Sequence, residues 1–503
     1  MKTKKILILI IAILVIAICL VACGETDDTT IPPPGQGSGN NGSGNGSNDG
    51  GSSNGNNGGT TPVTPPEAPT DSIDYMLSED STYAEVVGYW GNHERVVIAD
   101  TYQGKPVTTI REYVFQNAQF KSIYIPDSVT AFCEGAFVGN EAITEFTISK
   151  NVTIISKWTF AHCRALTNIN VDADNPNYSS IDGNLYNKEG TKLIQYAYGK
   201  EDNTFNVPEG VAIIGASSFI ENFNVATIIM PKSVIAIEQD AFSNSHGLTT
   251  IVMPGVKRID EAAFSFCDNL YNVNFGNSLI TIGDRAFNTS AISRVDFPNT
   301  LKTIGEDAFA GCNNLDVVEI PDSVTTLGDG AFMECESLDY LSIGDGVEVV
   351  GRHAFACCWT LSDVIFGSNI KTIGTSAFIS TALYAVELPD SVEVIEDSAF
   401  NGCQDLSYVT LSSALKTIGV QAFYNCNKIK SITIPANVTK IDRQAFASCA
   451  VLDNFTLEAH YGWSVYWYDY DQTEQISPED AAEIDQSLHY FSYLNLCEWS
   501  REE

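Results

Sequence analysis

The hydrophobic residues of this chain recur in one pattern after residue 110. A small residue followed by phenylalanine, or a close variant of that step, occurs fourteen times, at Phe115, Phe137, Phe160, Phe219, Phe242, Phe264, Phe287, Phe309, Phe332, Phe355, Phe378, Phe400, Phe423 and Phe446. Apart from one gap the spacing is 22 or 23 residues. This period is too short for a repeated strand and long helix, but it suits one coil of a solenoid. The pattern therefore predicts 14 stacked coils of 22–23 residues.

The coil that begins at Leu315 illustrates the expected local structure. In Val318–Ile320 two apolar residues flank a polar one, which is the alternation of a short strand with one buried face. Pro321 ends the strand because proline has no amide donor. Ala331 and Phe332 begin a tight turn, which we expect to be 3₁₀ or a single helical turn. The predicted fold is mainly β with short helical or 3₁₀ turns, a solenoid whose parallel strands stack about 4.8 Å apart.

Outward positions of the predicted strands supply the candidate binding surface. The residue before the first apolar strand position and the residue between the two apolar positions point away from the core. In the central coils these columns, with the position one step before them, hold the candidate partner-binding residues Val317, Glu319, Tyr340, Ile365, Tyr384 and Tyr408. Apolar and tyrosine side chains are enriched in binding surfaces. They are also ordinary strand formers, so each one alone has a purely structural explanation.

One interval breaks the repeat, the 59 residues from Phe160 to Phe219. Its extra segment, residues 172–204, contains apolar-alternating runs around a glycine turn and predicts an inserted β-hairpin. The coil pattern resumes in phase afterwards, so we expect the core register to stay intact. Tyr186 and Tyr196 make the hairpin a second candidate face for a partner.

The two ends of the array differ from its coils. Residues 71–113 alternate like strands without a full coil and predict an N-terminal cap for the solenoid of residues 114–457. Residues 458–503 are rich in aromatic side chains. This ending is interpreted as a C-terminal cap, with a glycan-binding platform as the alternative. The aromatic residues concerned are Trp463, Tyr466, Trp467, Tyr468, Tyr490, Phe491, Tyr493 and Trp499.

The first residues predict export and lipidation. Three lysines precede the apolar run Ile6–Ile18, which suits the core of a signal peptide. The following Leu20–Gly24 resembles the lipobox of bacterial lipoproteins, which implies a signal peptide over 1–22 and a lipid anchor on Cys23. Residues 23–70 are Gly, Ser, Asn and Pro-rich and predict a disordered tether. The expected location is the extracellular face of the bacterial cell membrane, projecting into or through the cell wall.

Charge narrows the class of partner. The formal net charge is -36 and the pI is near 4.3. Nucleic acid and anionic membrane surfaces are therefore excluded as expected partners, because neutralising phosphates requires a patch of Lys and Arg. Contact with a membrane is expected through the N-terminal lipid only.

No constellation of catalytic or metal-binding residues is recognisable. Six histidines are dispersed, and neither a zinc motif nor a phosphate-binding glycine loop occurs, so no cofactor or metal is expected. Eight cysteines occupy one coil position, three residues after the repeat phenylalanine, and we interpret them as packed thiols, although disulfides between adjacent coils stay possible. They are Cys163, Cys267, Cys312, Cys335, Cys358, Cys403, Cys426 and Cys449.

Together these coils resemble the BspA-type leucine-rich-repeat family of bacterial surface proteins, from Tyr83 to about Leu457. The resemblance implies a solenoid with a parallel sheet and a non-catalytic role in adhesion to host or matrix proteins, other cells or surface glycans. Two alternatives stay open, an exported glycan-active enzyme and a purely structural spacer. Neither the ligand nor the oligomeric state follows from the sequence.

Overall fold

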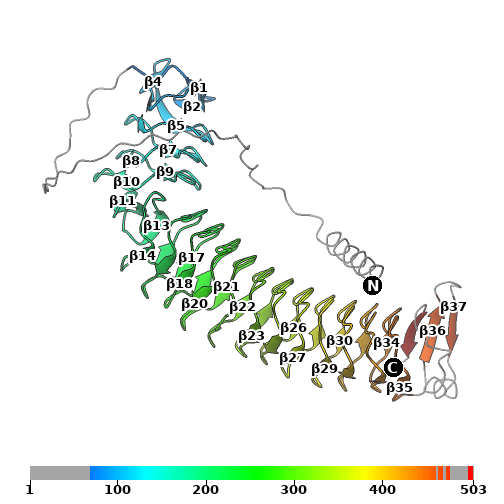
Figure 1. Ribbon diagram of the computed structural model, residues 1–503. Helices are drawn as coiled ribbons and strands as arrows, with labels where there is room; N and C mark the ends of the chain where they lie inside the picture. The colour runs from blue at the N-terminus through cyan, green and yellow to red at the C-terminus, as the bar shows by residue number, and fades with distance from the viewer. Residues whose placement is uncertain (1–67, 460–462, 468–471, 476–496, 502–503) are drawn as a thin grey trace, which may run out of the picture. The chain divides into compact units, whose positions relative to one another are not determined.

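The computed structural model describes residues 68–459, 463–467, 472–475 and 497–501. These residues form strands and turns, and within them no helix has the length and apolarity needed to cross a membrane. The predicted signal peptide, Cys23 and most of the tether lie outside the described residues, as does most of the predicted C-terminal segment. Residues 65–503 form one compact unit, in which the coils follow one another in chain order (Figure 1).

Most coils contribute one longer strand to a first column, and the coil of Phe287 is an exception. The apolar positions of these strands point inward, and neighbouring strands pair in parallel, for example Val318 with Leu341. The longer strands are β3 (Arg95–Val97), β6 (Ser122–Tyr124), β8 (Glu145–Ile148), β10 (Asn168–Val171), β14 (Thr204–Asn206), β16 (Thr227–Ile229), β18 (Thr250–Val252), β20 (Asn272–Asn274), β23 (Val317–Ile320), β25 (Tyr340–Ile343), β27 (Asp363–Ile365), β29 (Ala385–Glu387), β31 (Tyr408–Thr410), β33 (Ser431–Ile434) and β35 (Asn454–Leu457).

A second column holds strands of two residues, again parallel, in which the second residue is generally buried. Its members are β7 (Ala131–Phe132), β9 (Ile154–Ile155), β15 (Ile213–Ile214), β17 (Ala236–Ile237), β19 (Arg258–Ile259), β21 (Thr281–Ile282), β22 (Thr303–Ile304), β24 (Thr326–Leu327), β26 (Val349–Val350), β28 (Thr372–Ile373), β30 (Val394–Ile395), β32 (Thr417–Ile418) and β34 (Lys440–Ile441).

The turn around each repeat phenylalanine differs from the prediction. The residues two positions before and two positions after the phenylalanine have a left-handed backbone in all fourteen coils, as at His353 (φ 55°) and Cys357 (φ 59°) around Phe355. The prediction of 3₁₀ or helical turns was therefore wrong for the described coils. A left-handed residue on each side ends any right-handed run within three residues.

This turn explains how its backbone donors are satisfied. The amides of His353, Phe355 and Cys357 donate to carbonyls of the following coil at 2.8–2.9 Å, whereas the amides of Ala354 and Ala356 donate within their own turn. The two left-handed residues thus orient the turn so that every second N–H points at the next coil. A left-handed L-residue costs roughly 1–2 kcal/mol, which these hydrogen bonds, each worth about 1 kcal/mol net, offset.

The core is a column of stacked aromatic rings with aliphatic columns beside it. From Phe219 to Phe446 consecutive repeat phenylalanines lie 4.8–5.6 Å apart between ring centroids and nearly parallel. All of these side chains are buried. The predicted coil stacking is confirmed, and two further turns, one at the N-terminal end and one in the insertion, bring the solenoid to about sixteen turns.

The insertion forms that extra turn. Strands β11 (Tyr178–Ile181) and β12 (Asn184–Asn187) pair antiparallel, and β13 (Lys192–Gln195) pairs in parallel with β15 in the two-residue column. Tyr196 occupies the place of a repeat phenylalanine, because its ring stacks on Phe219 at 4.8 Å. The segment is therefore a shortened coil that contributes to the core, in addition to the expected hairpin.

The same segment divides the core into two clusters. One runs from Ile73 to Leu185 and the other from Tyr186 to Trp499. Leu185 and Tyr186 are neighbours in β12 and point to opposite sides of the strand, so each enters a different cluster. The buried side chains of Tyr196, Ser218 and Asn222 each contain a polar atom with no hydrogen-bond partner in the protein. We call this boundary the seam.

At the ends of the unit, antiparallel strands join the parallel column. β1 (Ile73–Leu77) pairs with β2 (Ala84–Tyr89), which pairs in parallel with β5 (Lys105–Ile110), itself also paired with the short β4 (Thr101–Tyr102). At the other end β38 (Cys497–Arg501) pairs with β34 and with β36 (Trp463–Trp467), which pairs with β37 (Gln472–Gln475). Trp499 in β38 is buried against the last coils.

The seam predicts two units of local unfolding. Phe332→Ala and Phe137→Ala each remove one fully buried stacked ring and should cost about 3–5 kcal/mol. Because the two residues belong to different core clusters, hydrogen exchange should quicken mainly in 186–457 for Phe332→Ala and mainly in 73–185 for Phe137→Ala. Equal loss of protection in both regions from either variant would contradict two separable cores.

The left-handed turn predicts a stabilising substitution. Ser380 has φ 60°, so Ser380→Gly should relieve about 1–2 kcal/mol of backbone strain against an entropic loss of about 0.5–1 kcal/mol. We expect a net gain near 0.5 kcal/mol in chemical unfolding. Ser337→Gly, at an exposed turn position without a positive φ, is the control and should destabilise. A loss of stability in both variants would disprove the strain argument.

Candidate functional site

The six predicted binding residues lie on the outer face of the longer strands of the central coils. Val317, Ile365, Tyr384 and Tyr408 are 39, 51, 54 and 63% exposed, and Glu319 is also exposed. Tyr340 is half-buried. Their inward neighbours, such as Val318 and Leu341, are fully buried. The structure therefore has the alternation of inward and outward side chains that the sequence predicted for these strands.

Strand register decides which of these residues meet. Val317 pairs with Tyr340, which pairs with Asp363 in the following coil. Glu319 and Ile365 occupy one column but are separated by Ser342, so they are not direct neighbours. Two columns thus run side by side across β23, β25 and β27, one of Val317, Tyr340 and Asp363 and one of Glu319, Ser342 and Ile365.

Tyr384 and Tyr408 form the closest aromatic contact on this face. Their ring centroids lie 5.3 Å apart in an edge-to-face arrangement. Tyr384 precedes β29, and the amide of Tyr408 donates to the Tyr384 carbonyl. A side-chain hydrogen bond with Tyr408 raises the pKa of Tyr384 above its ordinary value. Two adjacent rings give a partner a larger rigid contact than an isolated tyrosine.

The outer face is less regular than an unbroken ladder. Among the described longer strands, pairing is interrupted between β6 and β8, β10 and β14, β20 and β23, β27 and β29, and β31 and β33. Two of these interruptions, those before β23 and before β29, involve coils with one residue fewer between the repeat phenylalanine and the strand position, those of Phe287 and Phe378. The expectation of a continuous parallel sheet across all coils was therefore too simple.

One exposed aromatic residue was absent from the sequence prediction. Trp359 is 49% exposed and lies in the turn before β27. It was missed because only strand positions were considered, whereas a turn side chain on the same coil also reaches the surface. The comparison of coils could have found it, since the equivalent position, four residues after the repeat phenylalanine, holds a polar residue in nearby coils, at Asn313, Glu336 and Gln404.

Comparison with protein-family models places this geometry in a known group. The model described as "BspA type Leucine rich repeat region" matches residues 108–195, 191–315, 280–404 and 371–476, which together span more than half of the chain. The chain belongs to the BspA-type leucine-rich repeat family. Proteins of this kind are interaction or surface scaffolds built from repeated coils.

Of two solved structures similar to this chain, the one from Bacteroides ovatus supports the BspA-type fold. A leucine-rich repeat protein from Bacteroides ovatus is 25% identical, with 78% of this chain and 99% of that chain covered and a TM-score of 0.57. A leucine rich cell surface protein from Faecalibacterium prausnitzii is also 25% identical, covering 79% of this chain and 96% of that chain, with a TM-score of 0.40. A comparison with curated protein sequences gives no match.

In this BspA-type array, Tyr186 and Tyr196 do not form the second face that the sequence suggested for the insertion. Tyr186 and Tyr196 are 0 and 1% exposed, so the idea that they contact a partner was wrong. Both rings are part of the core cluster that continues into the later coils. Burial raises the pKa of both phenols above the ordinary range.

The seam is bridged at its surface by polar and aromatic contacts between the coils of Phe160 and Phe219. His162 Nδ1 lies 3.0 Å from Glu221 Oε2, and Trp158 donates to the Ser217 hydroxyl at 3.0 Å. Burial acts to raise the pKa of Glu221, but the His162 hydrogen bond and nearby positive charge hold it below its usual value. These contacts join the two clusters where the shortened coil does not.

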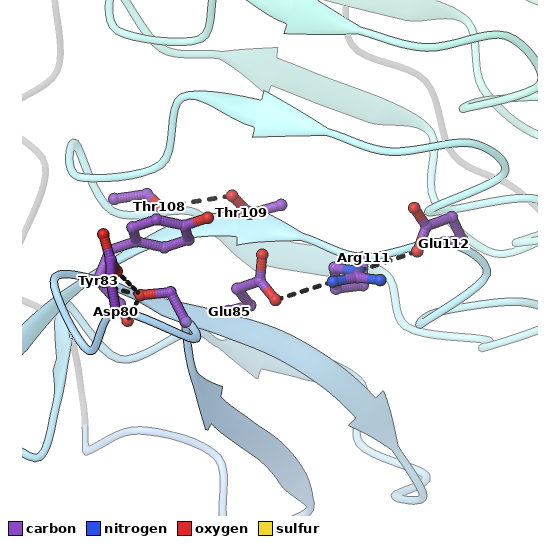
Figure 2. A network of polar contacts seen from close by, with 8 residues as sticks. Asp80, Tyr83, Glu85, Thr108, Thr109, Arg111 and Glu112 are labelled. Atoms are coloured by element: carbon purple, nitrogen blue, oxygen red, sulfur yellow. Dashed lines mark hydrogen bonds and ion pairs between the residues drawn. The ribbon is translucent and has the colours of Figure 1, made fainter.

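A polar cluster near the first strands is structural. Figure 2 shows Arg111 between Glu85 and Glu112, with Nη1 and Nε each 3.0 Å from a carboxylate oxygen. In the same shallow depression, the Asp80 carboxylate accepts hydrogen bonds from the backbone and hydroxyl of Thr82. The charged groups of Asp80, Glu85, Arg111 and Glu112 are therefore paired with one another or used in a turn.

The repeated cysteines also have a structural role. Each of the eight thiols donates to the carbonyl of the repeat phenylalanine in the preceding coil, at 3.0–3.3 Å, as Cys335 does to Phe309. They are free thiols, and burial raises the pKa of Cys163 and Cys358 to about 12. Among the described residues, no group of three or more His, Cys, Asp and Glu side chains could hold a metal ion.

Proposed function

We propose that the chain is a non-catalytic recognition module of the bacterial surface that binds a protein or a glycan through the outer face of its longer strands. The observation that carries this proposal is the presence of exposed Val317, Ile365, Tyr384 and Tyr408 and half-buried Tyr340 on one outward face, whose inward neighbours build the core. Large apolar and aromatic side chains are costly to leave in water unless a partner covers them.

The scaffold supports such a role energetically. Inter-coil hydrogen bonds and stacked rings fix the backbone of every central coil, so its outward side chains are held in a rigid row before a partner arrives. Tyrosine gives a large contact area and loses little conformational entropy on binding. Outward residues can also vary without a change in core packing, which lets one fold carry different specificities.

The same proposal includes lipid attachment at Cys23. The lysines, the apolar run Ile6–Ile18 and the residues around Cys23 support it. A tether of 47 residues after Cys23 has a typical end-to-end distance of about 40 Å, and fully extended it reaches about 150 Å. Such a tether would hold the solenoid at a distance from the membrane, as a display protein requires.

The tyrosine pair provides the direct test of the binding face. Tyr384→Ala with Tyr408→Ala should weaken attachment to the cognate protein or glycan, found on a glycan and matrix-protein array, at least tenfold, or about 1.4 kcal/mol. The melting temperature should not change, because both side chains are exposed. Tyr271→Ala is the matched control, since Tyr271 holds the same coil position as Tyr384 and is 56% exposed. Equal binding by the pair variant and the wild type would reject this face.

Lipidation has a separate test. Cys23→Ser should abolish incorporation of a palmitate analogue during growth, because the serine hydroxyl cannot form the thioether. Unfolding of the solenoid should be unaffected, since Cys23 precedes the compact unit of residues 65–503. Cys133→Ser, at a half-buried thiol within the array, is the control and should keep the label. Undiminished label on Cys23→Ser would overturn the assignment.

A further inference from the structure

The outer face of the central coils has a local charge that differs from its surroundings. Five successive strand segments, residues 313–322, 336–345, 359–368, 382–390 and 404–412, contain ten Asp and Glu residues and no Lys, Arg or His. We call these segments with their exposed aromatic residues the acidic tyrosine strip. Its carboxylates are Asp316, Glu319, Asp322, Glu336, Asp339, Asp345, Asp363, Glu387, Asp390 and Asp405.

Cations mark both ends of the strip. The preceding coil has Arg294 on its outer face, and the following coil has Lys428 and Lys430. All ten carboxylates are exposed. Only Asp405 forms a salt bridge among the described residues, with Lys428 at 2.5 Å. Nine of the ten carboxylates of the strip therefore have no salt-bridge partner among the described residues.

Aromatic and acidic groups alternate within reach of one another on this strip. Tyr340 lies between Val317 and Asp363 in one column of paired residues. Tyr384 and Tyr408, in contact at 5.3 Å, lie two and three coils further along, and Glu387 ends β29, the strand that follows Tyr384 and pairs with β31. A ring face attracts a cation through its quadrupole, and an adjacent carboxylate adds direct charge attraction. Both groups select for positive charge.

From this charge complementarity we propose that the strip binds a lysine- and arginine-rich segment of a partner protein. The inference rests on the proposed function, because it names the class of ligand for the same face. Five coils about 4.8 Å apart span about 20 Å, which an extended basic segment of about six residues covers. Its methylene stems pack on Val317, Ile365 and the tyrosine rings while its charged ends meet the carboxylates.

Charge location distinguishes this proposal from general attraction to an acidic protein. The strip variant is Glu319→Gln with Asp363→Asn and Glu387→Gln, three exposed strand residues whose side chains make no hydrogen bond or salt bridge within the described part of the chain. The control variant is Glu201→Gln with Asp202→Asn and Glu209→Gln, three exposed residues away from the strip. Both variants remove three negative charges, so their net charge is the same.

Binding of fluorescent oligolysine and oligoarginine peptides to the full-length chain is measured by fluorescence anisotropy at low and physiological salt. We expect the strip variant to bind at least tenfold more weakly, the control variant to bind within about twofold of the wild type, and added salt to weaken binding in all three. Tyr384→Ala with Tyr408→Ala should also weaken it, with Tyr271→Ala as its control.

Equal binding of the peptides by the strip and control variants would overturn the basic-segment proposal. If the tyrosine pair variant then still loses its array ligand, the recognition function stands and the ligand belongs to another class, such as a neutral glycan. If the tyrosine pair variant keeps its array ligand as well, both proposals fail.

Discussion

The backbone hydrogen bonds between successive coils are the interaction on which the rest of the structure depends. No coil contains enough internal pairing to satisfy its own amides and carbonyls, so each coil needs a neighbour on both sides. The two strand columns meet this need by parallel pairing. The turn around the repeat phenylalanine meets it by left-handed residues, which direct alternate amides to the next coil. Side-chain stacking follows from this backbone spacing, because rings at the same coil position are brought to contact distance.

Because each coil relies on its neighbours for hydrogen bonds, the shortened coil of the insertion leaves a polar group of the next coil without a partner. The shortened coil keeps the spacing through β13 and Tyr196, whose amide donates to the Ser218 carbonyl as a repeat phenylalanine would, but one side-chain contact of the following turn is lost. Asn222 illustrates the result. Its amide nitrogen has no partner in the protein, whereas the cysteines and Ser245 at the same coil position reach a carbonyl of the preceding coil. The His162–Glu221 contact then joins the coils on either side.

The outer face can carry function because its side chains do not take part in core packing. Each longer strand sends alternate side chains inward to the columns and outward to solvent, so the acidic tyrosine strip can vary while Val318, Leu341 and their equivalents stay fixed. The polar cluster of Glu85, Arg111 and Glu112 and the cysteine column show the opposite case. Their polar groups are already bonded within the protein, and they serve the scaffold.

Periodicity by itself determined the coil length, the inward columns and the outward positions of Val317, Tyr384 and Tyr408. These properties depend on side-chain alternation and on a fixed repeat, both of which are written in the order of residues. The sequence could not reveal the left-handed turns, because their geometry is imposed by hydrogen bonding between adjacent coils. Glycine, the residue that usually marks such a backbone, fills only five of those positions, Gly135, Gly139, Gly311, Gly330 and Gly402. It also misassigned Tyr186 and Tyr196, because a buried and an exposed tyrosine look alike until the chain folds back on its neighbours. The contact between Tyr384 and Tyr408, the break between β27 and β29, and the division of the core at the seam were decided by tertiary structure, since each depends on how one coil registers against the next.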